Sequence, residues 1–176
     1  MPTAKSWNWD ISCDPKALSR FGTYDFLARI CETLRNDPKT GQPLRNTYVV
    51  SPDIVVTRTS QFNNQTVPIL HAIISCKWTT RNDWAQNTRT EVLNLIRNRK
   101  DNLPHVVAIT AEPFPSRIAA LALGTGDLDC VYHFALHELL ESAKELNNEE
   151  SLEILNMMVQ GRRLRDISDL PFDLAI

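Results

Sequence analysis

The sequence lacks the patterns that identify several protein classes. Its four cysteines are widely spaced and form no CxxC pair: Cys13, Cys31, Cys76 and Cys130. This spacing argues against a structural zinc site and against a small disulfide scaffold, and reduced thiols are the simpler interpretation. The chain also contains no internal repeat and no low-complexity segment.

Long apolar runs are absent as well. No segment approaches the roughly 18 to 20 apolar residues needed to span a bilayer. The first residues, Met1–Lys5, contain no apolar signal segment. We therefore expect an intracellular protein without a membrane partner.

Charge of one sign is not in excess, because the net charge is only −2. The charges are distributed unevenly, however. Residues 77–100 contain six bases and two acids, whereas residues 127–176 contain eleven acids and four bases. The basic stretch could attract a polyanion locally. The alternative is a solvated helix face held by salt bridges.

The length of 176 residues, with 43% hydrophobic and 23% charged residues, predicts one globular domain. Residues 1–20 are expected to be irregular, and Ser60–Gln65 to form a polar turn. Apolar and β-branched runs predict strands, and helical spacing with capping residues predicts helices. The expected strands are 48–50, 54–56, 67–76, 106–110 and 130–134, and the expected helices are 24–34, 84–99, 115–123 and much of 135–159. This order predicts an α/β fold with a mixed central β-sheet flanked by helices.

Three residues at the ends of these elements suggest phosphodiester hydrolysis. Asp53 follows Pro52 beside a short strand, Lys77 follows a buried strand, and Glu91 lies fourteen positions later on the next helix. Asp53 and Glu91, with the backbone carbonyl of Cys76, would offer Mg²⁺ the hard oxygen ligands it prefers. Lys77 would orient the attacking water or offset charge in the transition state. Three such residues alone are a weak signal, since Asp53 could simply begin a turn.

Longer strings surround these residues. They are Ser51–Arg58, Ile74–Asp83, Ala85–Lys100, Thr110–Pro113, Pro115–Ile118, Ala122–Gly126, Cys130–Leu136 and Asp166–Pro171. Together they resemble NgoMIV-type type II restriction endonucleases of the PD-(D/E)XK superfamily. The resemblance is dense over residues 48–176 and faint over residues 1–47.

The resemblance implies a restriction-endonuclease-like catalytic domain over residues 1–176, with catalytic residues Asp53, Lys77 and Glu91. In the family, one carboxylate lies on the following helix instead of two positions before the catalytic lysine. In this chain Ser75 occupies that earlier position, and Glu91 stands where the relocated acid is expected. Members of the family use Mg²⁺ and cut double-stranded DNA at sites with a CCGG core, GCCGGC among them. They work as homodimers or homotetramers in the bacterial cytoplasm, beside a cognate DNA methyltransferase.

The resemblance also implies residues that read bases. Arg81 and Asp83 match residues that contact guanine and cytosine, and Arg117 matches an arginine placed to read the outer base pair. Trp84 stands where the family has a second guanine-reading arginine, and an indole cannot make that bidentate contact. Three further cations are expected to contact phosphates, with ordinary surface charge as the alternative: Arg97, Arg99 and Lys100.

Trp84 and the short region before Asp53 motivate two alternatives. One is a truncated or degenerate relative that binds DNA without efficient cleavage, because the family's N-terminal helical glutamate has no convincing counterpart here. The other is a nuclease of relaxed specificity.

His133 and His137 have i, i+4 spacing and could bind a metal ion on one helix. A structural role for these histidines is the favoured interpretation, because no third ligand is near in sequence.

Overall fold

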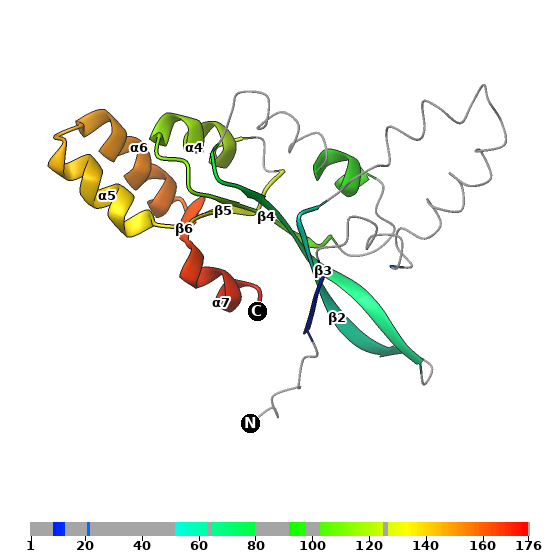
Figure 1. Cartoon of the computed structure of the whole chain (residues 1–176). Helices are drawn as coiled ribbons and strands as arrows, with labels where there is room; N and C mark the ends of the chain where they lie inside the picture. The colour runs from blue at the N-terminus through cyan, green and yellow to red at the C-terminus, as the bar shows by residue number, and fades with distance from the viewer. Residues whose placement is uncertain are drawn as a thin grey trace, which may run out of the picture. The chain divides into compact units, whose positions relative to one another are not determined.

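The structure is a computed structural model, and it describes residues 9–12, 21, 52–62, 65–79, 92–97, 103–124 and 127–175 (Figure 1). The chain divides into two compact units. The first comprises Met1–Ile73 and Asn94–Pro104, and the second comprises Ile74–Leu93 and His105–Ile176. Strand β3 (Gln65–Lys77) begins in the first unit and ends in the second.

The first unit contains β1 (Trp9–Ser12), β2 (Ile54–Phe62) and most of β3 (Gln65–Lys77). β1 pairs antiparallel with β2, with Ile11 opposite Val56. β2 and β3 are hydrogen-bonded neighbours and form the long twisted ribbon in Figure 1. Consecutive residues Val55 and Val56 are both buried, so both faces of β2 are covered at this point. β-branched side chains suit such a strand because they pack well on a pleated surface.

Two sequence predictions for this unit were wrong. Residues 1–20 are not wholly irregular, because Trp9–Ser12 forms β1. The polar turn expected over Ser60–Gln65 is shorter, since β2 extends to Phe62 and β3 begins at Gln65. Pairing between neighbouring strands satisfies backbone groups whatever the side chains, so polar residues can extend a strand.

The second unit contains the end of β3, β4 (His105–Thr110), β5 (Cys130–His133) and β6 (Leu164–Asp166), in that order across the sheet. β4 pairs parallel with β5, and β5 pairs parallel with β6. Every residue of β5 is buried. Parallel strands covered on both faces are typically continuous apolar runs, as Val106–Ile109 illustrates.

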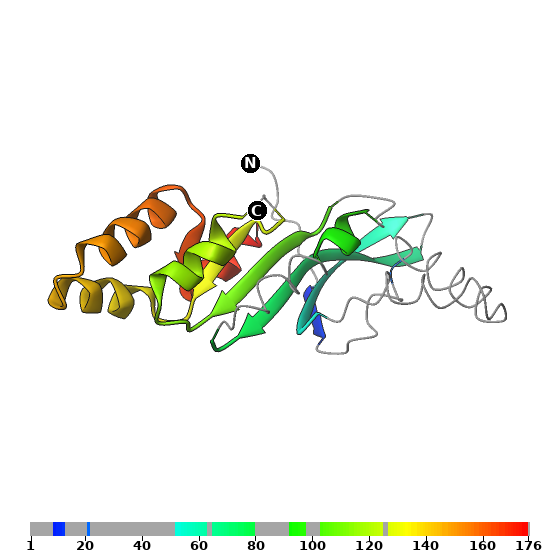
Figure 2. The ribbon, with the colours of Figure 1, turned by 90° about the horizontal axis from the view of Figure 1, so that it is seen from above.

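Helices cover the sheet of the second unit. They are α4 (Pro115–Ala122), α5 (Leu136–Glu145), α6 (Glu149–Gln160) and α7 (Leu170–Asp173), the last after the short 3₁₀ turn Ile167–Asp169. In Figure 1, α4 lies above the strands and α7 below them. Figure 2 shows α5 and α6 side by side, joined by a short turn. α6 also packs against α4, where Ile118, Leu155 and Met158 are fully buried.

Most of the predicted elements of the second unit are confirmed. The strands expected over 106–110 and 130–134 correspond to β4 and β5, and the expected helices over 115–123 and 135–159 correspond to α4, α5 and α6. Residues 92–97 are helical, inside the helix expected over 84–99. The predicted strand 48–50, the predicted helix 24–34 and the remainder of 84–99 lie outside the described residues. Antiparallel and parallel pairs both occur, which confirms the α/β class with a mixed sheet. No helix among the described residues has the length and apolar character that a bilayer crossing requires.

Candidate functional site

Asp53 and Lys77 each lie at the end of a strand. In the first unit, exposed Asp53 occupies a bend between buried Pro52 and the first residue of β2. In the second unit, exposed Lys77 is the last residue of β3, directly after half-buried Cys76. A bend or strand end lets a polar side chain reach solvent while its neighbours stay in the core. Both residues therefore occupy positions suited to contact with a substrate.

Several predicted residues lie outside the described part of the chain. Among them is Glu91, which directly precedes the helical residues 92–97. The others are Arg81, Asp83, Trp84, Arg99 and Lys100. Arg97 is described and exposed at the end of the helical segment. Within the described residues, no three His, Cys, Asp or Glu side chains are grouped to hold a metal ion. The expected ligand set includes Glu91, so it remains a prediction.

In the second unit, the segments that follow β3, β4 and β5 are tied together by their backbones. The amide of Ala111 donates to the carbonyl of Trp78 at 3.1 Å, and the amide of Phe134 donates to the carbonyl of Thr110 at 2.9 Å. The Trp78 and Phe134 rings lie 5.9 Å apart at 48°. Trp78 is 72% exposed and Phe134 56% exposed. Trp78, the residue after Lys77, therefore belongs to an exposed aromatic pair with Phe134.

Arg117 projects from the first turn of α4 and has two specific neighbours. Its Nη1 lies 3.7 Å from Oε1 of Glu112, and its guanidinium carbon lies 4.9 Å from the centre of the Phe114 ring. The Arg117 side chain is 49% exposed, whereas that of Glu112 is fully buried. Sequence reasoning singled out Arg117 and missed Glu112, because a glutamate beside a proline looks like an ordinary loop residue.

His133 has a structural role in this region, and the metal-binding alternative for it was wrong. Its Nε2 lies 3.0 Å from the carbonyl oxygen of Glu112, and its Nδ1 accepts from the amide of Ala135 at 3.1 Å. Because a carbonyl only accepts, the Nε2 atom carries the hydrogen, and both ring nitrogens are engaged. His133 also ends β5 while His137 lies on α5, so the two do not share one helix.

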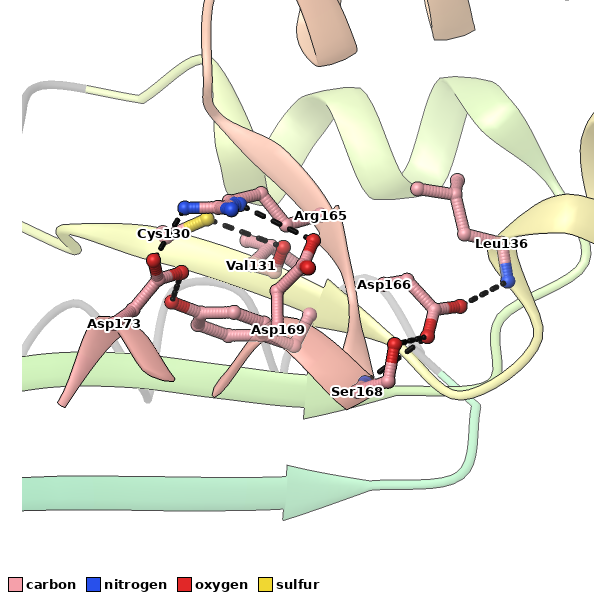
Figure 3. Close-up of polar contacts among 9 residues, drawn as sticks. Cys130, Val131, Leu136, Arg165, Asp166, Ser168, Asp169 and Asp173 are labelled. Carbon is pink, nitrogen blue, oxygen red and sulfur yellow. Dashed lines mark hydrogen bonds and ion pairs between the residues drawn. The ribbon is translucent and has the colours of Figure 1, made fainter. Parts of the chain in front are cut away.

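A second polar cluster joins the C-terminal segment to β5 (Figure 3). Tyr132 donates to Asp173 at 2.7 Å, and Arg165 contacts both Asp173 and Asp169. Burial, with the hydrogen bond to Asp173, raises the pKa of Tyr132. Burial also raises the pKa of the nearby Cys130 thiol to about 11. The contacts of Tyr132 and Arg165 with Asp169 and Asp173 therefore join the C-terminal segment, including α7, to strands β5 and β6.

Asp166 organises the turn after β6. Its Oδ1 accepts from the amide and the hydroxyl of Ser168 at 2.9 and 2.7 Å, and its Oδ2 accepts from the amide of Leu136 at 3.4 Å. Burial opposes ionisation, but these hydrogen bonds outweigh it and lower the pKa of Asp166. This capped turn lies within Asp166–Pro171, one of the segments whose sequence resembles the family.

The α/β fold with its mixed sheet agrees with the restriction-endonuclease class. The family model described as NgoMIV restriction enzyme matches residues 59–176, and the chain belongs to this family. It is 46% identical over 182 aligned positions to the type II restriction enzyme NgoMIV of Neisseria gonorrhoeae. That alignment covers 90% of this chain and 64% of the relative. The similarity therefore extends into residues 1–47, and the chain spans about two thirds of the relative's length.

Proposed function

We propose that this chain is a Mg²⁺-dependent type II site-specific deoxyribonuclease that hydrolyses double-stranded DNA at a GCCGGC or CCGG-like site. The observation that carries the proposal is the family match over residues 59–176, which includes both Lys77 and Glu91. Lys77 is exposed at a strand end, as a residue that contacts DNA must be. The relative is named as a type II restriction enzyme, which agrees with this class of activity.

The proposed chemistry assigns each residue one task. Asp53, Glu91 and the carbonyl of Cys76 are oxygen donors, and such donors fit Mg²⁺ better than they fit softer metals. Once bound, the ion would polarise the phosphate and lower the pKa of a coordinated water. The ammonium group of Lys77 would orient the attacking water or offset charge on the pentacovalent transition state. The exposure of Asp53 and Lys77 supports these tasks.

Recognition would divide between bases and phosphates. Arg81, Asp83 and Arg117 would contact base edges, with Trp84 beside them, and Arg97, Arg99 and Lys100 would contact phosphates. The proposal further includes one catalytic domain over residues 1–176, a homodimer or homotetramer, a bacterial cytoplasmic location and a cognate DNA methyltransferase. Two-fold symmetry would match a palindromic site.

A plasmid assay tests the proposal. Plasmids with GCCGGC, with CCGG only and with neither site are incubated with the chain at low salt, with Mg²⁺ or with a chelator. We expect discrete Mg²⁺-dependent cleavage at GCCGGC, and a loss of at least about 100-fold for Lys77→Ala. DNA binding without cleavage by the unaltered chain would instead support the degenerate relative. Cleavage at scattered sites would support relaxed specificity.

A further inference from the structure

Glu112 lies in the loop between β4 and α4, and its conformation is fixed from several sides. Its amide donates to Thr110 Oγ1 at 3.1 Å, and its carbonyl accepts from His133 Nε2 at 3.0 Å. Both residues that hold its backbone in this way, Thr110 and His133, belong to the second unit. The side chain has no exposed surface. Glu112 is therefore a rigid feature of this strand end.

The buried carboxylate of Glu112 is directed toward the first turn of α4. Its Oε1 accepts from the amide of Phe114 at 3.2 Å and lies 3.7 Å from Nη1 of Arg117. A buried carboxylate is costly unless it is paired and hydrogen-bonded, and these two contacts supply both. The carboxylate also bounds one edge of the guanidinium, while the Phe114 ring bounds one face.

Such an arrangement changes what Arg117 can offer to DNA. Attraction to phosphate depends on net charge, and the carboxylate of Glu112 cancels much of the charge of Arg117. A guanidinium has five hydrogen-bond donors, more than one ion pair can engage. Half of the Arg117 side chain is exposed, so donors can reach a ligand. A held, charge-compensated arginine suits the directional contact with guanine O6 and N7.

We propose that Glu112 is a positioning residue, which orients Arg117 for a contact with a base edge and suppresses its attraction to phosphate. This inference rests on the proposed function, because it takes double-stranded DNA as the substrate. It assigns a task to a residue that touches no DNA itself. If Glu112 acts in this way, Arg117 and an exposed cation such as Arg97 should differ in how much each contributes to the salt dependence of DNA binding.

The test measures binding of fluorescent duplexes by anisotropy, with Ca²⁺ replacing Mg²⁺ so that DNA is bound without being cut. The duplexes contain GCCGGC, ACCGGT with the outer pairs exchanged, and an unrelated sequence, each over a series of salt concentrations. The variants are Glu112→Gln, Arg117→Gln, the double variant, and Glu141→Gln as a matched exposed carboxylate on α5. Circular dichroism and thermal melting establish that each variant is folded.

We expect Glu112→Gln to reduce discrimination between GCCGGC and ACCGGT by about tenfold, within the range of one lost bidentate contact. Its binding to unrelated DNA should become tighter, with a salt slope steeper by about one, because Arg117 regains its full charge. A merely structural loss would weaken all binding instead. Arg117→Gln should lower discrimination similarly, and adding Glu112→Gln to it should have no further effect on discrimination. The double variant should also return the salt slope to that of the unaltered chain, because the two changes together leave the local charge as it was.

Several results would overturn the inference. One is normal discrimination by folded Glu112→Gln. Another is normal discrimination by Arg117→Gln, which changes a half-exposed side chain and remains informative if Glu112→Gln fails to fold. A third is a double variant whose salt slope is as steep as that of Glu112→Gln. An equal effect of Glu141→Gln would also refute it. If the unaltered chain does not prefer GCCGGC, the proposed function fails together with the inference. If the unaltered chain does prefer it and the Glu112 and Arg117 variants behave otherwise than expected, the inference alone fails.

Discussion

Tyr132 on β5 donates its phenolic hydrogen to Asp173 on α7 across 2.7 Å, and Arg165 on β6 binds the same carboxylate (Figure 3). One acidic side chain thus joins two strands to the last helix of the described chain. Tyr132 is only 2% exposed, so its hydroxyl depends on this acceptor.

Replacing Tyr132 by Phe should lower the free energy of unfolding by about 2 kcal/mol, because a buried hydrogen bond to a charged group is lost. Urea denaturation measures the change. In an Asp173→Ala background, the same substitution should cost much less, since the acceptor is already absent. An equal cost in both backgrounds would show that the hydroxyl acts through other contacts.

The hydrogen bonds to Asp166 predict a pH-dependent contribution to stability. Its pKa is lowered in the folded chain, so its carboxylate stabilises the fold above the unfolded pKa of about 3.8. That contribution is lost as the pH falls through the lower, folded value. The difference in unfolding free energy between the unaltered chain and Asp166→Asn should be constant near neutral pH and shrink below about pH 4. Urea unfolding at several pH values measures it.

Ser168→Ala serves as the second variant of this experiment, because it removes the hydroxyl donor at 2.7 Å and retains the amide donor. It should shift the acid loss of stability toward higher pH than in the unaltered chain. A stability difference for Asp166→Asn that does not change with pH would contradict the assigned hydrogen bonds.

Cys130 should resist alkylation in the folded protein. Burial raises the pKa of its thiol to about 11, so the reactive thiolate is scarce at neutral pH, and the side chain is 8% exposed. Iodoacetamide at pH 8, followed by peptide mass spectrometry, should modify Cys130 at least about tenfold more slowly in the native protein than in urea. Equal rates in the two states would refute this burial.

Arg97 should contribute to DNA affinity through its charge alone. It is exposed at the end of the helical residues 92–97, where it can reach a phosphate. Arg97→Gln should weaken binding to all duplexes alike and reduce the magnitude of the salt slope by about one. The anisotropy titrations described for Glu112 measure both quantities. A loss of affinity confined to the GCCGGC duplex would instead indicate that Arg97 contacts a base.

Local patterns predicted the strands that carry the candidate site. The apolar run 67–76 predicted most of β3, because a strand that is covered on both faces tends to be apolar at consecutive positions. β1 and β6 were missed because, unlike the equally short β5, they contain charged residues and form no apolar run, and their stability comes from pairing with β2 and β5. Only the folded structure supplies those partners.

The same distinction applies to the site residues. Asp53 and Lys77 were predicted as site residues because a charged residue at the end of an apolar run is visible in the sequence, and the structure places both at strand ends. Glu112 was missed because its burial depends on His133 and Arg117, which contact it from β5 and α4. A sequence position carries no local sign that distant side chains will enclose it.

The parallel pairing of β4, β5 and β6 also bears on how the second unit folds. Each pairing joins segments separated by helices, α4 in one case and α5 with α6 in the other. Such non-local pairings form only after long stretches of chain have been brought together. Domains that depend on them fold slowly compared with helical bundles. During synthesis, the edge of β5 that pairs with β6 can therefore be covered only after α5, α6 and β6 have emerged.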